Sequence, residues 1–132
     1  MQPKTKSTIC VAVALGVASA LCGAANGQEI PPACAQLVRV TDECTADLAN
    51  WADFNDPAGA AKIRETIGPK AAQLKMSIQQ AVKEKGAIAV AQQCASQDVK
   101  QKIIGNMGGM ITPVLMNRGD ASNCENALAS MQ

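Results

Sequence analysis

Apolar residues recur at helical spacing in the segment that follows residue 32. From Ala33 to Phe54 they alternate at intervals of three and four residues and fall within about 100° of a helical wheel. This apolar stripe consists of Cys34, Leu37, Thr41, Cys44, Leu48 and Trp51, with Val40 at its edge. The opposite side carries Arg39, Asp42, Glu43, Asn50 and Asp53. The pattern therefore predicts one long amphipathic helix.

Prolines and glycines divide the following residues into separate helices. Asp56 can cap a second helix and Pro57 can occupy its first position, because proline fits the first turn of a helix. This helix is expected to end near Ile67, where Gly68-Pro69 interrupts the pattern. The segment from Lys70 to Lys85 is helical again. Its apolar side consists of Ala71, Leu74, Ile78, Ala81 and Val82.

Two opposed apolar stripes follow residue 86. The first consists of Ala87, Val90, Ala91 and Cys94. The second lies nearly opposite on the same wheel and consists of Val99, Ile103, Met107 and Met110. A single straight helix cannot present both stripes to one core, so we predict a break near Ser96, which can cap the next helix.

The end of the chain predicts one more short helix. Pro113 and Arg118-Gly119-Asp120 interrupt the preceding pattern, and Ser122-x-x-Glu125 has the form of a capping box. The inward residues would be Cys124, Ala127, Leu128 and Met131. No segment alternates with a period of two, which argues against strands. We therefore expect an all-α fold, a small bundle of about four to six short helices.

The first residues have the three parts of a secretory signal peptide. Met1 to Lys6 is positively charged, Ile9 to Leu21 is apolar, and Cys22 to Gly27 is small and weakly polar. The apolar run is shorter than the roughly 20 residues that a spanning helix needs. The chain is therefore expected to be exported, and to work in the periplasm or to be secreted.

Two details of this leader stay open. Cleavage after Ala25 or Gly27 fits the preference for small residues best, and cleavage after Ala20 is the alternative. Lipidation of Cys22 is less favoured, because the residue before it is large and the third residue before it is polar. A buried N-terminal helix is the structural alternative to a leader.

Removal of the leader leaves one small domain. We expect a cleaved signal over residues 1–27, a flexible lead-in over 28–32 and a single helical domain over 33–132. The remaining chain of roughly 105 residues can form one core. Because Lys4 and Lys6 leave with the signal, the net charge changes from +1 to about −1.

The predicted mature chain keeps Cys34, Cys44, Cys94 and Cys124. Four cysteines in a short exported chain imply two disulfides. Cys34 and Cys44 lie on one predicted helix with their Cα atoms roughly 15 Å apart, too far for a bridge. They are therefore expected to pair with Cys94 and Cys124. If the first helix runs antiparallel to a later layer of helices, the nested arrangement is favoured, with Cys44 bonded to Cys94 and Cys34 to Cys124. The crossed arrangement stays open.

The residue types argue against catalysis. The chain has no histidine, which is the commonest general base and nucleophile activator. It also lacks a C-x-x-C redox motif, paired zinc ligands, a phosphate-binding loop and a nucleophile elbow. Asp42, Glu43 and Asp47 crowd one helix and are expected to point outward as a solvated acidic face. We expect no enzyme, no catalytic residue, no cofactor and no metal ligand.

Three other features have a functional and a structural interpretation. Met107, Met110 and Met116, with Met76 and Met131, could form a copper(I) thioether site, although a core filled with methionine is favoured. Gly105-x-x-x-Gly109 indicates a close helix crossing or a flexible spot. The basic middle segment could contact an acidic partner or a membrane surface, whereas export and the lack of aromatic residues argue against nucleic acid. Its residues are Lys62, Arg64, Lys70, Lys75, Lys83 and Lys85.

Short segments around three cysteines resemble a class of bacterial proteins. They are Ala33-Cys34-Ala35-Gln36-Leu37-Val38, Asp42-Glu43-Cys44 and Gln92-Gln93-Cys94-Ala95. In these segments and in the cysteine spacing, the chain resembles small periplasmic proteins that are all-helical, disulfide-stapled and without an assigned function. The resemblance covers residues 33–96. It implies a compartment and a fold class, and no functional residue.

We expect an exported, non-catalytic helical protein that acts through protein–protein contacts, as an inhibitor, an immunity-type protein or a stress-related binder. The expected partner is another exported protein. No transmembrane segment is expected in the mature chain, and the sequence does not indicate an oligomeric state. The alternative is a periplasmic protein that binds a small ligand or copper along its methionine-lined face.

Overall fold

The computed structural model describes residues 29–132. Within this range it contains α1 (Pro32–Asn55), α2 (Pro57–Ile67), α3 (Lys70–Lys85), α4 (Ala87–Ala95), α5 (Gln97–Met116) and α6 (Ser122–Ala129). No strand occurs in the described part of the chain, so the predicted all-α class is confirmed. The predicted signal peptide, its cleavage sites and Cys22 lie outside the described residues.

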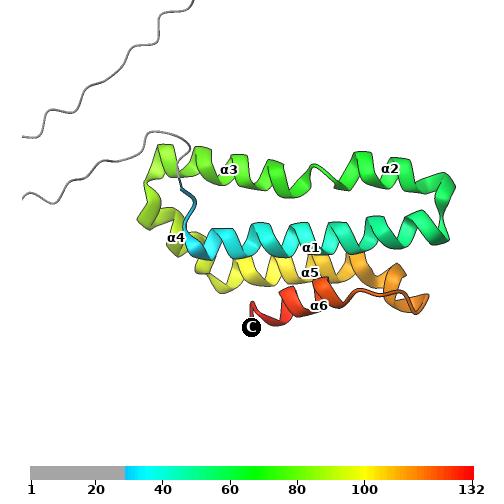
Figure 1. Ribbon diagram of the computed structural model, residues 1–132. Coiled ribbons are helices and arrows are strands. Elements are labelled where there is room, and N and C mark those ends of the chain that lie inside the picture. Colours follow the sequence, from blue (N-terminus) through cyan, green and yellow to red (C-terminus); the bar gives the residue numbers. More distant parts are fainter. Residues whose placement is uncertain (1–28) are drawn as a thin grey trace, which may run out of the picture.

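Helix α1 is the centre of the bundle and contacts each of the other five helices. Helices α2 and α3 return along one side of it, α4 turns at the end where α1 begins, and α5 then runs in the same direction as α1 (Figure 1). Helix α6 returns along α1 once more. Because neighbours surround it, α1 buries residues beyond its predicted apolar stripe, and these include Thr45, Asp47, Ala49 and Ala52.

The predicted starts of α2 and α5 depend on local chemistry, and the structure confirms them. The carboxylate of Asp56 accepts a hydrogen bond from the Gly59 N–H at 3.0 Å, and Pro57 is the first residue of α2. The hydroxyl of Ser96 accepts one from the Val99 N–H at 3.4 Å and separates α4 from α5. These side chains satisfy N–H groups that have no partner inside the first turn of a helix.

The core is small and aliphatic. Its largest fully buried side chains are Ile111, Met131, Val40, Val114, Cys34, Cys44 and Cys124. Trp51 is half-buried and packs against the cluster from one end. A core of this kind contains little aromatic surface, so covalent cross-links are expected to supply a large share of the stability.

Both disulfides form, but the preferred pairing was wrong. Cys34 is bonded to Cys94, with Cα atoms 5.1 Å apart, and Cys44 to Cys124, with Cα atoms 4.3 Å apart. The nested arrangement assumed that the later helices run antiparallel to α1. Instead α4 ends beside the start of α1, and α5 carries the chain back in the direction of α1 before α6 returns (Figure 1). Cys124 therefore arrives beside Cys44, farther along α1.

The start of α6 is capped by a side chain of another helix. This corrects the predicted capping box at Ser122 and the predicted outward orientation of Asp47. Ser122 lies inside α6, and Ala121, which precedes the helix, provides no side-chain cap. Asp47 on α1 accepts hydrogen bonds from the Cys124 N–H and from the Asn123 side-chain amide, each at 2.9 Å. Asp47 is only 5% exposed, so it does not point outward with its acidic neighbours. Its charge faces the positive end of the α6 dipole.

Helix α5 continues through Pro113 and ends one turn later in a Schellman motif. The Gly119 N–H donates to the Val114 carbonyl at 2.8 Å, and the Arg118 N–H donates to the Leu115 carbonyl at 3.1 Å. The motif requires a left-handed residue, which here is Arg118 at φ 56°. The next residue, position 119, has to be glycine, because a Cβ there would lie 2.5 Å from Trp51 Cδ1.

Exchanging the residue types at this turn should change stability in opposite directions. Arg118→Gly should raise the free energy of unfolding by about 0.5–1 kcal/mol, because glycine adopts positive φ without steric cost. Gly119→Ala should lower it, since the new methyl group would overlap Trp51 and Val114. Urea unfolding followed by Trp51 fluorescence measures both. A loss of stability in Arg118→Gly would contradict this account of the turn.

Candidate interaction surface

Large apolar side chains are exposed at the end of the bundle where α1 and α5 both terminate (Figure 1). Phe54 at the end of α1 is 86% exposed, and Met116 at the end of α5 is 79% exposed. Leu115 beside it is 44% exposed. Together with the half-buried Trp51, these residues form what we call the aromatic end. It contains the only phenylalanine and the only tryptophan of the chain.

Trp51 is held at this end by backbone that approaches it closely. Gly119 leaves no room for a Cβ between itself and the indole ring. The indole Nε1 is buried and has no hydrogen-bond partner among the described residues. Tryptophan in this position supplies apolar area beside the exposed Phe54, and aromatic residues contribute strongly to protein–protein binding.

The outer face of α5 extends the aromatic end with a neutral surface. Gly105, Gly109 and Thr112 lie on one line with Met116, and no charged residue occurs from Ile103 to Asn117. A Cβ added at either glycine would meet nothing within 4 Å. The predicted close crossing at Gly105-x-x-x-Gly109 is therefore wrong within the described chain, because these glycines face outward.

The carboxylates near the aromatic end serve structural roles. Asp53 forms an ion pair with Arg64 of α2, and the hydrogen bond from the guanidinium is the main reason that the pKa of Arg64 is raised. Asp120 accepts from the Ser122 N–H at 2.9 Å, and this hydrogen bond lowers the pKa of the carboxyl group. Asp53 thus links α1 to α2, and Asp120 organises the turn before α6.

The predicted functional residues are dispersed. Of the acidic cluster, Asp42 is exposed and Glu43 half-buried, while Asp47 is buried in its capping role. The four cysteines form the two bridges. The lysines of the basic segment are exposed along α2 and α3, where Arg64 pairs with Asp53. Among residues 29–132, no group of three or more histidine, cysteine or acidic residues could hold a metal ion.

The methionines differ in exposure, and Met110 is half-buried against the core. Met107 and Met131 are buried in the core, whereas Met76 on α3 and Met116 on α5 are exposed. A small apolar cleft of about 190 Å³ lies over α3, α4 and the start of α5, and none of the residues that line it is a methionine. Its volume is below the range of about 300–1,000 Å³ that ligand sites usually have.

Phe54 was not predicted as a surface residue, although the sequence carries a signal for it. On the helical wheel Phe54 falls about 60° outside the apolar stripe of α1. An aromatic residue beyond the core stripe at a helix end is a candidate for an external contact. That Leu115 and Met116 are exposed at the same end could be seen only in the fold, because it depends on α1 and α5 running in the same direction.

In the described part of the chain, no helix has the length and apolar character needed to cross a bilayer. Comparison with protein-family models, curated proteins and solved structures finds no match to this chain. The resemblance to small periplasmic proteins stays a prediction.

Proposed function

We propose that this chain is an exported, non-catalytic binder that recognises another exported protein through its aromatic end. The observation that carries the proposal is Phe54, which is 86% exposed and lies at the same end as Leu115 and Met116. Exposure of several large apolar side chains at one place is typical of an interaction site, because apolar surface that stays in water does not stabilise a domain without a partner.

Two further features support a contact surface. The outer face of α5 is uncharged over its last four turns and continues into Met116, so a partner meets little desolvation cost there. The two disulfides hold α1 to α4 and to α6, which keeps the surface rigid before binding. A preorganised surface loses less conformational entropy when it binds. Such a scaffold suits an inhibitor, an immunity-type protein or a stress-related binder.

The test is partner capture from the exported protein fraction of the source cell, with a photo-crosslinker placed next to Phe54. The wild-type chain should retain a specific partner, and Phe54→Asp should weaken its binding by at least about tenfold, as for a central interface residue. Ile88→Asp is the matched control, because Ile88 is 78% exposed at the opposite end of the bundle. Trp51 fluorescence should change when the partner binds.

Two results would argue against the proposal. One is the recovery of no specific protein under any growth or stress condition. The other is equal weakening by Phe54→Asp and Ile88→Asp, which would place the contact elsewhere. The copper alternative is not carried forward, since the methionines are divided between the core and separate exposed positions.

A further inference from the structure

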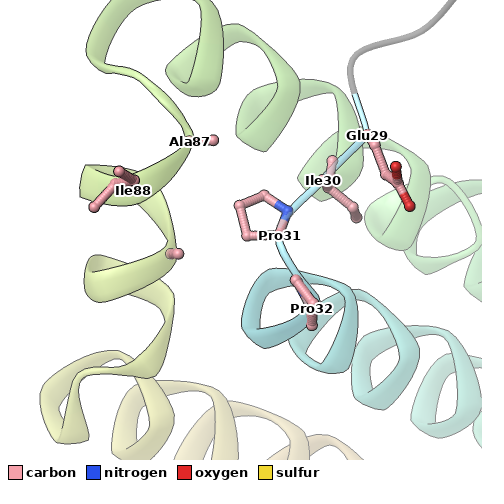
Figure 2. A pocket seen from close by; sticks show the side chains of 7 residues that line it. Glu29, Ile30, Pro31, Pro32, Ala87 and Ile88 are labelled. Carbon is pink, nitrogen blue, oxygen red and sulfur yellow. The ribbon is translucent and has the colours of Figure 1, made fainter. Parts of the chain in front are cut away.

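The opposite end of the bundle carries a second apolar surface, built from the lead-in and the start of α4. A shallow hollow of about 350 Å³ lies there, lined by Glu29, Ile30, Pro31, Pro32, Ala87, Ile88 and Ala91. Figure 2 shows Ala87 and Ile88 on the first turn of α4 on one side of it and the lead-in residues on the other. Ile88 is 78% exposed, so this end presents a branched apolar side chain to solvent.

Basic residues precede this apolar turn in the chain. Lys83 and Lys85 are exposed at the end of α3, and Gly86 at φ 86° turns the chain from them into α4. Lys85 is therefore three residues from Ile88. Two carboxylates share this region: Glu84 accepts a hydrogen bond from the Gln80 side chain at 2.6 Å, and Glu29 lines the hollow. An apolar tip flanked by lysines is the pattern of a surface that rests on anionic lipid.

The predicted leader precedes this end of the bundle in the chain. The apolar segment predicted to enter the bilayer during export ends at Leu21, and the described chain begins at Glu29 in the wall of the hollow. The connecting residues can span at most roughly 28 Å when extended. The predicted leader, while attached, would therefore hold the end that carries Ile88 nearest to the lipid headgroups.

We propose that this end, which we call the lysine–isoleucine end, docks on an anionic membrane surface. Ile88 inserts between headgroups, and Lys83 and Lys85 pair with lipid phosphates. The aromatic end then faces away from the bilayer and stays open to a protein partner. The inference is independent of the protein-binding function, because the two surfaces lie at opposite ends of α1 (Figure 1).

The test is co-sedimentation of the protein, purified from the exported fraction, with vesicles of phosphatidylglycerol mixed with phosphatidylcholine. Vesicles of phosphatidylcholine alone are the comparison. The protein should bind the anionic vesicles and bind the neutral ones at least about tenfold more weakly. Ile88→Asp should reduce binding about tenfold or more, and Lys83→Gln with Lys85→Gln should reduce it by about 25-fold, about fivefold for each lysine. Glu29→Gln should tighten binding, because it removes a like charge from the interface.

Phe54→Asp is the matched control, since it places the same charge on an equally exposed apolar residue at the aromatic end. It should leave vesicle binding unchanged, and unchanged circular dichroism should confirm that every variant folds. The proposal is overturned if anionic and neutral vesicles bind alike, if neither binds, or if Phe54→Asp weakens binding as much as Ile88→Asp. A photo-crosslinker next to Ile88 that captured a protein instead of lipid would also overturn it.

Discussion

Replacing Cys44 and Cys124 together by serine should lower the free energy of unfolding by about 4 kcal/mol, the largest loss expected for this protein. The bridge joins residues 80 positions apart, and it restricts the unfolded chain in proportion to the logarithm of that separation. The Cys34–Cys94 bridge spans 60 positions and should contribute almost as much. Denaturant unfolding of the oxidised proteins, monitored through Trp51, measures both losses.

The choice of cysteine pair also tests the connectivity. The Cys34→Ser/Cys94→Ser variant removes one complete bridge, so it should fold with the Cys44–Cys124 bridge intact and without a free thiol. The Cys34→Ser/Cys124→Ser variant removes half of each bridge. Because Cys94 lies beside the start of α1 and Cys44 is roughly 15 Å farther along it, both should stay as free thiols. Thiol labelling distinguishes the two, and a bridge in the second variant would contradict the crossed arrangement.

Removing the carboxylate of Asp47 should cost about 2–4 kcal/mol. Asp47→Ala leaves the Cys124 N–H without its acceptor in a buried position and removes a charge from the positive end of α6. It also releases the side chain of Asn123. Asp47→Asn should cost less, because its amide oxygen can still accept a hydrogen bond from the backbone. Thermal or urea unfolding of each variant supplies the comparison.

The matched control is Asp42→Ala, which removes an exposed carboxylate from the same helix. It should change the free energy of unfolding by less than about 0.5 kcal/mol, as surface substitutions usually do. Hydrogen exchange at the Cys124 amide adds a local readout, since loss of the acceptor should speed exchange at the start of α6 first. Equal effects of Asp47→Ala and Asp42→Ala would show that Asp47 does not cap this helix.

The sequence by itself determined the boundaries of α1 to α4 and the start of α5. The apolar periodicity of α1, the Asp56-Pro57 start of α2 and the change of stripe at Ser96 are properties of a few neighbouring residues, and such local signals do not depend on the rest of the fold. Cysteine number and spacing likewise determined that Cys34 and Cys44 cannot bond to each other, because the geometry of one helix excludes it.

The tertiary structure decided which cysteines meet, what Asp47 does and which side chains share the aromatic end. Each of these depends on the direction of α5 relative to α1, which no local pattern specifies. A parallel α5 brings the end of that helix to the end of α1, and the return of α6 then brings Cys124 and its N–H to Cys44 and Asp47. Contacts between residues more than 70 positions apart follow from that one packing choice, whereas helix boundaries follow from the chain next to them.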